Sequence, residues 1–293
     1  MSGSVRVGVL QMRSGMHPQA NLDAIAQGAA EASQKGVRYL LTPEMSVAFA
    51  ETREQLKEIA RPFAGNDALA RCGRVARDHG LFLHLGSLAV AGPDGRFFNR
   101  SVLFAPTGDI VCHYDKIHLF DADVAGDDAY RESSTYCAGK RAVVADTPLF
   151  RLGMSICYDV RFPALFRVLG QAGAQVISLP AAFTVPTGEA HWEVLVRARA
   201  IETGSFVVAA AQGGAHENGR QTFGHSMIVD PWGRVLARNK GQEPGLIVAL
   251  LELENVQRAR TSIPNLGNDA QFCSSVNHVA VQSAGRSAEG FKG

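Results

Sequence analysis

The chain has 293 residues, of which 46% are hydrophobic and 19% charged, and its formal net charge is +1. This composition is typical of a globular protein with enough apolar residues for a large core, built as one large domain or two moderate ones. The near-neutral charge, without a long Lys/Arg run, argues against a nucleic-acid partner, so a small neutral or anionic ligand is the simpler expectation.

The cysteines and the first residues indicate the cellular compartment. The cysteines are an odd number and include no Cys-x-x-Cys pair, which argues against a disulfide framework and a structural zinc site; they are Cys72, Cys112, Cys137, Cys157 and Cys273. The N-terminus lacks the pattern of a signal peptide, and no apolar run is long enough to span a membrane. We therefore expect a reduced, cytoplasmic protein with no membrane partner.

The first part of the chain alternates predicted strands and helices. Alternating or apolar runs predict the strands, and apolar residues at helical spacing predict the helices. The expected strands are 5–11, 37–41 and 81–86, and the expected helices are 18–35, 53–60 and 67–79. This order is typical of a sheet covered by helices.

The middle of the chain changes to hairpins. Residues 97–104 and 110–114 predict adjacent strands joined by a turn at 106–109, so we expect a sheet of mixed direction with helices on one face. The next segment, 121–139, is rich in Asp, Gly and Ser. It predicts a long irregular loop, and such loops carry function or are mobile.

Alternation returns in the second half. The expected order is helix 163–173, strand 174–180, loop 181–188, helix 189–202, strand 205–212, hairpin 227–237 and strand 245–253. Residues 274–293 show no apolar period, which predicts a disordered polar tail after a domain that spans residues 1–273.

Three residues with hydrolytic chemistry, Glu44, Lys116 and Cys157, each follow a predicted strand. Taken singly, Glu44 could be a solvated loop residue, Lys116 a solvated charge on a long stem, and Cys157 a small core hydrophobe. The functional alternatives are an acid or base, an ammonium that stabilises an oxyanion, and a nucleophile. Cys157 stands where a strand turns into a helix, and the partial positive charge of helix N–H groups predicts that its thiolate is favoured.

The motifs around these residues resemble the nitrilase superfamily of carbon–nitrogen hydrolases, whose catalytic triad is Glu, Lys and Cys in that chain order. The matching runs are Leu-Thr-Pro-Glu at 41–44, Asp-Lys-Ile-His-Leu-Phe at 115–120 and Gly-Met-Ser-Ile-Cys-Tyr-Asp-Val-Arg-Phe-Pro at 153–163. The resemblance extends from about residue 5 to residue 272. Further runs, at 130–133, 182–193, 197–202, 224–225 and 230–233, are similar to the Nit branch of the superfamily.

The resemblance implies an α/β fold, namely a four-layer α-β-β-α sandwich with two central mixed sheets flanked by helices. It implies pairing with a second subunit across helices, as a homodimer or a higher homo-oligomer. It also implies a second glutamate, Glu132, close to the lysine and the cysteine. The implied substrate is a small amide that carries a carboxylate, with deaminated glutathione first, ω-amides of 2-oxo acids next, and N-carbamoyl compounds or nitriles behind.

Amide hydrolysis requires a strong nucleophile, a site for the oxyanion and a proton for the departing nitrogen. We expect Glu44 to accept the Cys157 proton, to protonate the leaving nitrogen, and then to activate water against a thioester. Lys116, helped by the backbone N–H of Tyr158, is expected to hold the oxyanion. Glu132 is expected to position Lys116 or the substrate.

Substrate contacts are expected from the segments that follow Cys157, at Arg161, Phe183, Thr184, Thr187 and His191. Arg161 could pair with a substrate carboxylate or form an ion pair that supports the turn, and packing near the site is the default alternative for His191. The signatures of serine hydrolases, zinc proteases and nucleotide-binding proteins are absent from the sequence, so we expect no metal and no cofactor. A catalytically idle binding or scaffold subunit is the non-enzymatic alternative, which the complete triad argues against.

Overall fold

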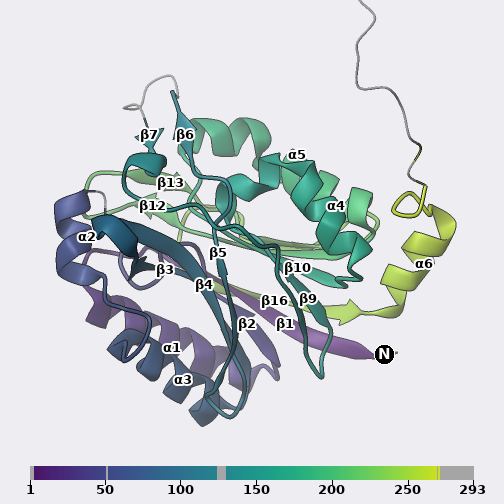
Figure 1. Ribbon diagram of the computed structural model, residues 1–293. Coiled ribbons are helices and arrows are strands. Elements are labelled where there is room, and N and C mark those ends of the chain that lie inside the picture. The colour runs from purple at the N-terminus through teal and green to yellow at the C-terminus, as the bar shows by residue number, and fades with distance from the viewer. Residues whose placement is uncertain (1–2, 51, 124–129, 269, 271–293) are drawn as a thin grey trace, which may run out of the picture.

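The computed structural model describes residues 3–50, 52–123, 130–268 and 270. Two six-stranded sheets lie face to face, and helices cover the outer face of each sheet, so that one chain contains all four α-β-β-α layers (Figure 1). The predicted four-layer α/β sandwich is confirmed. The polar tail predicted at 274–293 lies outside the described residues.

The first sheet has the order β16-β1-β2-β3-β4-β5. Its strands are β1 (Ser4–Gln11), β2 (Tyr39–Leu41), β3 (Phe82–Ala91), β4 (Phe97–Phe104), β5 (Ile110–Asp115) and β16 (Gly245–Glu252). Strands β1, β2 and β3 run parallel, whereas β16, β4 and β5 pair antiparallel, so the sheet is mixed as expected. Helices α1 (Pro18–Gln34) and α3 (Asp67–His79) form its outer layer, with α2 (Arg53–Ile59) at one end (Figure 1).

The second sheet has the order β15-β14-β11-β10-β9-β8. Its strands are β8 (Val144–Asp146), β9 (Arg151–Met154), β10 (Val176–Ala181), β11 (Phe206–Ala211), β14 (Met227–Val229) and β15 (Val235–Arg238). Strands β9, β10 and β11 are parallel, and helices α4 (Pro163–Gln171) and α5 (Val185–Thr203) cover their outer face (Figure 1). Because the central strands β10 and β11 are buried on both faces, they are apolar almost throughout.

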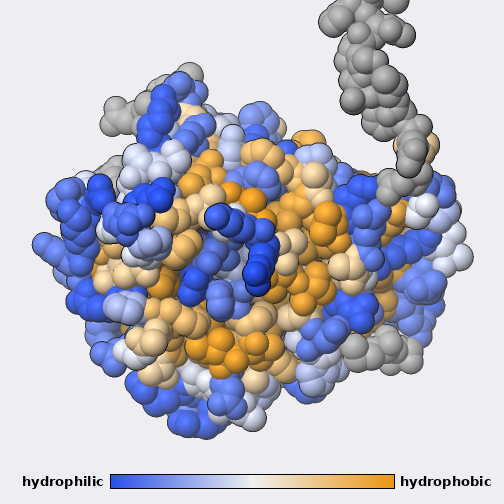
Figure 2. All heavy atoms as spheres, viewed as in Figure 1, coloured by the Kyte–Doolittle hydropathy of each residue, from blue (hydrophilic) through white to orange (hydrophobic). Residues whose placement is uncertain are grey.

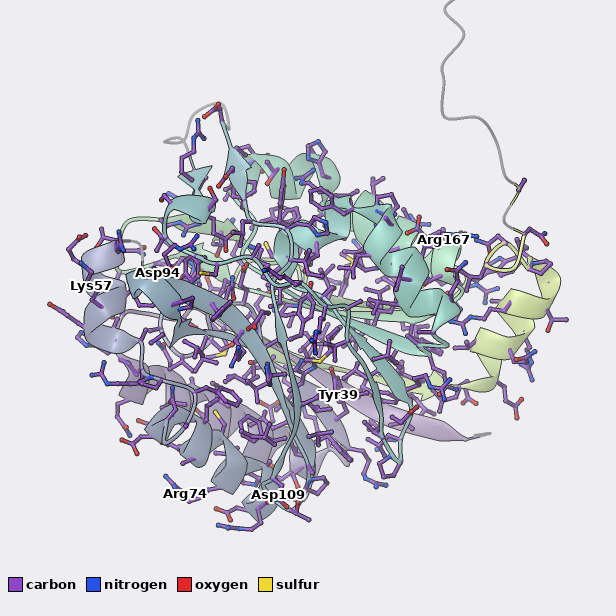
Figure 3. The ribbon with its side chains drawn as sticks, viewed as in Figure 1. Tyr39, Lys57, Arg74, Asp94, Asp109 and Arg167 are labelled. Atoms are coloured by element: carbon purple, nitrogen blue, oxygen red, sulfur yellow. The ribbon has the colours of Figure 1, made fainter. Side chains whose placement is uncertain are left out.

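The main core fills the space between the two sheets. Tyr39 of the first sheet lies at the centre of the molecule, where its ring packs edge-on against Phe150 with 5.3 Å between ring centroids (Figure 3). Its hydroxyl shares a 2.6 Å hydrogen bond with Nδ1 of His84. On the face shown in Figure 2, apolar residues gather in a band across the middle, above the more hydrophilic layer of α1 and α3.

Several elements differ from the sequence-based expectation. Helix α5 begins at Val185, so residues 185–188 are helical and the loop predicted there is shorter; Pro186 is tolerated because first-turn N–H groups have no helical acceptor. Strand β3 continues five residues beyond its predicted end, to Ala91. The unpredicted elements are β8, β12 (Gly213–Ala215), β13 (Gln221–Phe223), α6 (Glu254–Ser262), and β6 (Asp121–Ala122), β7 (Tyr130–Arg131) and the 3-10 helix η2 (Glu132–Ser134) within the predicted loop.

Candidate active site

The three candidates Glu44, Lys116 and Cys157 lie together although they come from different sheets. Glu44 follows β2 and Lys116 follows β5 in the first sheet, whereas Cys157 follows β9 in the second. Their exposed fractions are 5%, 2% and 8%, so all three are buried. The solvated alternatives for Glu44 and Lys116 are therefore wrong, because partners that are distant in sequence enclose both charges.

The ammonium of Lys116 lies between two carboxylates. Its Nζ is 3.0 Å from Oε1 of Glu44 and 2.8 Å from Oε2 of Glu132. Burial by itself lowers the pKa of Lys116, but the charges of Glu132, Glu44 and Cys157 together raise this pKa well above its usual value. Lys116 is thus a fixed buried cation, and Glu132 lies beside it as the resemblance implied.

Three further hydrogen bonds fix the carboxylates. Nδ2 of Asn99, on β4, donates to Oε1 of Glu44 at 2.9 Å and to Oε1 of Glu132 at 3.3 Å. The backbone N–H of Phe120 donates to Oε2 of Glu132 at 2.6 Å. Asn99 was not among the predicted site residues, because one Asn in a strand pattern carries no local signal that its side chain will lie between two acids.

The backbone turns sharply at Cys157. This residue has φ +48°, a left-handed value that non-glycine residues rarely adopt, and it begins the short 3-10 helix η3 (Cys157–Arg161). The fully buried Asp159 secures the turn: its Oδ2 accepts the N–H of Ile156 at 2.8 Å and the hydroxyl of Tyr114 at 2.7 Å, and its Oδ1 accepts the N–H of His118 at 3.0 Å. Because Tyr114 and His118 flank Lys116, Asp159 ties the lysine segment to the cysteine turn.

The thiol of Cys157 is protonated at rest. Burial raises its pKa well above the usual value and the charge of Glu44 raises it further, whereas Lys116 and a hydrogen bond from the N–H of Ala182 lower it less. The predicted preference for the thiolate is therefore wrong, since the dipole of a five-residue 3-10 helix does not offset the loss of solvent. Glu44, whose charge acts on the thiol, is the candidate acceptor for the thiol proton.

A cavity of about 870 Å³ opens onto these groups, with Glu44, Lys116, Glu132 and Cys157 in its wall. Of the other predicted site residues, the wall contains Tyr158, Arg161, Phe183, Thr184 and Thr187. The hydroxyls of Thr184 and Thr187 are bonded to each other at 2.8 Å. His191 is exposed and is not in the wall; its Nδ1 lies 3.3 Å from the Arg161 guanidinium.

The Arg161 side chain is half-buried beside aromatic rings. Its guanidinium carbon is 5.5 Å from the centroid of Phe183 and 6.0 Å from that of Tyr158. Within the described part of the chain it forms no ion pair with a carboxylate. The described residues therefore do not form the ion pair that was one of the two alternatives for Arg161; the other alternative is a substrate carboxylate.

The described residues contain neither a candidate metal site nor a membrane-spanning helix. Among them, no three or more His, Cys, Asp or Glu side chains are grouped so that they could hold a metal ion. Nor do they include a helix with the length and apolar character needed to cross a bilayer.

The chain is similar to known proteins over nearly its whole length. Residues 6–261 match the family described as carbon-nitrogen hydrolase. A relative named deaminated glutathione amidase, from Yersinia enterocolitica, is 39% identical over 279 residues, which cover 93% of this chain and 95% of the relative.

Two solved structures share the fold. The NitFhit protein of C. elegans is 36% identical with a TM-score of 0.85; the match covers 92% of this chain but only 65% of that longer chain. An amidase from Nesterenkonia sp. AN1 is 29% identical with a TM-score of 0.73 and covers 89% and 98% of the two chains, and its structure shows acrylamide added to the active-site cysteine of a glutamate-to-glutamine mutant. The similarity to the Nit branch that the sequence indicated is confirmed by such relatives.

Proposed function

The chain belongs to the carbon–nitrogen hydrolase family, and from this premise we propose that it hydrolyses a small carboxylate-bearing amide, deaminated glutathione, through a covalent thioester on Cys157. The observation that carries the proposal is that Cys157, Glu44 and Lys116 line one cavity, with the Lys116 ammonium held between the carboxylates of Glu44 and Glu132. These groups are a nucleophile, a base and a cation for the oxyanion.

The first half of the reaction forms the thioester. Because Cys157 rests as a thiol, Glu44 takes its proton as the sulfur attacks the amide carbon. The carbonyl electron pair moves to oxygen, and Lys116 and the backbone N–H of Tyr158 stabilise this oxyanion. As the second residue of η3, Tyr158 has an N–H without an acceptor inside the helix, which leaves it available to the substrate.

The second half releases both products. Glu44 returns its proton to the leaving nitrogen as the C–N bond breaks, and the amine or ammonia departs. The same carboxylate then takes a proton from water as the water oxygen attacks the thioester, and it returns this proton to sulfur as the C–S bond breaks, which releases the carboxylic acid and restores the thiol. Glu132 holds Lys116 charged and in place throughout, through its oxygens at 2.8 and 3.2 Å from Nζ.

The substrate assignment rests on the cavity and on the relatives. A cavity of about 870 Å³ accepts a ligand of this size. Arg161 lies four residues after Cys157 on the same short helix, so it can pair with a carboxylate on the acyl half of the substrate while that half is bound to sulfur. We place deaminated glutathione first because relatives carry the name deaminated glutathione amidase; 2-oxoglutaramate, which shares the acyl half, is the runner-up.

The test is a substrate panel read out as the carboxylic acid product. The wild type is incubated with deaminated glutathione, 2-oxoglutaramate, an N-carbamoyl amino acid and a nitrile, and the Cys157→Ala variant serves as control. We expect the highest kcat/KM with deaminated glutathione and no turnover by the variant. A variant as active as the wild type would refute the covalent mechanism. If the wild type acts on no amide and iodoacetamide fails to modify Cys157 at neutral pH, the idle-subunit alternative holds instead.

We propose further that the chain is a homodimer that pairs through the outer face of α4 and α5. Exposed large apolar side chains gather on these helices and on the adjoining β14–β15 turn, at Val168, Val194, Ile201 and Trp232. Helices α1, α2 and α3 expose none among the described residues. Sedimentation should show a dimer for the wild type and a monomer for Val194→Asp, and a monomeric wild type would contradict the proposal.

A cytoplasmic location is proposed as well. Among the described residues Cys72, Cys112, Cys137 and Cys157 are free thiols. A protein that works through a thiol is expected in a reducing compartment. Fractionation of cells that contain a tagged full-length chain tests this, and recovery from a secreted fraction would contradict it.

A further inference from the structure

A second arginine, Arg220, also lines this cavity. It lies in the turn between β12 and β13, half-buried, with its guanidinium carbon 4.9 Å from the ring centroid of Phe49 and 5.3 Å from that of Tyr130. Within the described ranges, its guanidinium forms no ion pair and no hydrogen bond with the protein. A partly desolvated guanidinium without an anion is a ready partner for a carboxylate.

The turn that carries Arg220 is anchored. The side chain of Asn218 donates to the carbonyl of Phe49 at 3.0 Å, and its Oδ1 accepts the N–H of Arg220 at 3.2 Å. The N–H of His216 donates to the carbonyl of Arg220 at 2.8 Å, and the His216 ring stacks on Phe49 with 4.1 Å between centroids. Arg220 is therefore presented from a fixed backbone, which lowers the entropy cost of binding an anion.

Another arginine in the wall, Arg131, provides a contrast. Its guanidinium is 2.7 Å from a carboxylate oxygen of Asp123 and also donates to the carbonyl of Tyr130 at 2.7 Å. The donors of Arg131 are thus engaged by the protein itself. An arginine in the cavity wall can therefore be fully paired with the protein, as Arg131 is, whereas, among the residues that the structure describes, Arg220 is not.

Arg161 and Arg220 reach the cavity from different segments of the chain and contact different aromatic rings. Arg161 shares the helix η3 with Cys157, which keeps the acyl half of the substrate. Arg220 lies over Phe49, in the segment that continues from Glu44, the proposed proton donor to the leaving nitrogen. If Arg161 pairs with the acyl carboxylate, Arg220 is left for the other half of the substrate.

The charges of the site make such cations necessary. Glu44, Glu132 and Lys116 together carry a net charge of −1, which repels an anionic substrate. The charge of Arg220 also acts on Tyr136, a residue in the cavity wall. Burial, Glu132 and Glu44 raise the pKa of Tyr136, whereas Lys116 and Arg220 lower it. Arg161 and Arg220 add the two positive charges that an amide with two carboxylates requires.

We propose that Arg220 binds a carboxylate on the leaving-amine half of the substrate. It would thereby select amides that release a peptide with a C-terminal carboxylate over amides that release ammonia. The inference rests on the proposed function and extends it. Deaminated glutathione fits this selection, because its leaving group is a dipeptide with a C-terminal carboxylate. 2-Oxoglutaramate has the same acyl half but gives Arg220 no anion.

The test compares deaminated glutathione with its C-terminal carboxamide, which differs only in the charge of the leaving half. For the wild type, kcat/KM should favour the acid by roughly 10- to 100-fold, chiefly through KM, as expected for one charged hydrogen-bonded contact. In Arg220→Gln this preference should fall to about one. Arg131→Gln, a matched change in the same wall, should keep the wild-type preference.

The outcomes separate this inference from the proposed function. A wild type that hydrolyses acid and carboxamide equally well, or an Arg220→Gln variant that keeps the preference, would overturn the role of Arg220 and leave the amidase proposal standing. If the wild type hydrolyses neither, the proposed function fails, and calorimetry with the same two compounds decides the inference separately. Tighter binding of the acid that is lost in Arg220→Gln supports it, and equal binding overturns it.

Discussion

Replacement of Lys116 by Met tests how strongly the buried charges depend on one another. Methionine keeps the apolar stem but removes the ammonium that lies 3.0 Å from Glu44 and 2.8 Å from Glu132. The amide of Asn99 then still donates to both carboxylates, and the N–H of Phe120 donates to Glu132. Two like charges remain in a site from which water is largely excluded.

The expected loss is large because the side chain of Lys116 is only 3% exposed. Removal of one partner from a buried ion pair costs about 3–5 kcal/mol, a large part of the roughly 5–15 kcal/mol that stabilises a typical domain. Lys35 provides a matched control, since its Nζ lies 2.7 Å from Glu31 but its side chain is 50% exposed. Lys35→Met should cost less than about 1 kcal/mol.

The assay is urea unfolding of both variants and the wild type at pH 7 and pH 5. The destabilisation of Lys116→Met should shrink at pH 5, because a proton bound between the two carboxylates can replace the missing positive charge. The double variant Lys116→Met/Glu132→Gln removes one carboxylate as well and should be more stable than Lys116→Met at pH 7. Ammonia or amine release should fall by at least about 10²-fold with the loss of an oxyanion donor.

A small effect of the Lys116→Met change would contradict the dependence of Glu44 and Glu132 on the ammonium. If Lys116→Met unfolds within about 1 kcal/mol of the wild type at pH 7 and shows the same pH dependence, the two carboxylates do not need the ammonium. Equal effects of Lys116→Met and Lys35→Met would lead to the same conclusion.

Three further predictions follow from buried polar groups. Burial lowers the pKa of His84 to about 3, so the protein should lose stability as pH falls from about 6.5 to 3, by at most roughly 5 kcal/mol for this group. In thermal denaturation, the stability of His84→Gln should depend less steeply on pH over this range. Because the charge of Glu44 raises the pKa of Cys157, Glu44→Gln should lose turnover yet react with iodoacetamide at neutral pH at least as fast as the wild type, and resistance to alkylation would contradict this. Asn99→Asp adds a third carboxylate and should destabilise the protein more at pH 7 than at pH 5. Asn99→Leu should cost about 1–3 kcal/mol at both pH values. Equal pH dependence of the two variants would count against a charged cluster of Glu44 and Glu132 around Asn99.

The fold was most predictable where local signals agreed with the tertiary structure. Helix α3 has the predicted bounds, because Asn66 accepts the N–H groups of Ala68 and Leu69 at one end and Gly80 takes φ +63° at the other. The hairpin of β12 and β13 was missed, since each strand has only three residues, β12 contains two glycines, and neither shows an apolar alternation. The start of α5 was placed too late because Pro186 was interpreted as part of a loop.

The site was predictable only in part. The motifs around Glu44, Lys116 and Cys157 identified residues that do lie together. The position of Asn99 could not be predicted, because its partner Glu44 is 55 residues away and nothing local to β4 indicates the contact. The protonated state of Cys157 was also missed, since burial, which dominates its pKa, depends on the complete fold.

These buried charges also explain why the proposed chemistry needs no large reorganisation. Before attack, the negative charge lies on Glu44, 3.0 Å from the Lys116 ammonium. As Glu44 takes the thiol proton, an equal negative charge forms on the substrate oxygen, which the same ammonium stabilises. The net charge of the enclosed site therefore stays constant while its position changes around one fixed cation. An environment that raises the pKa of both Cys157 and Lys116 suits this transfer, because it keeps the proton on sulfur until the carbonyl can accept the charge.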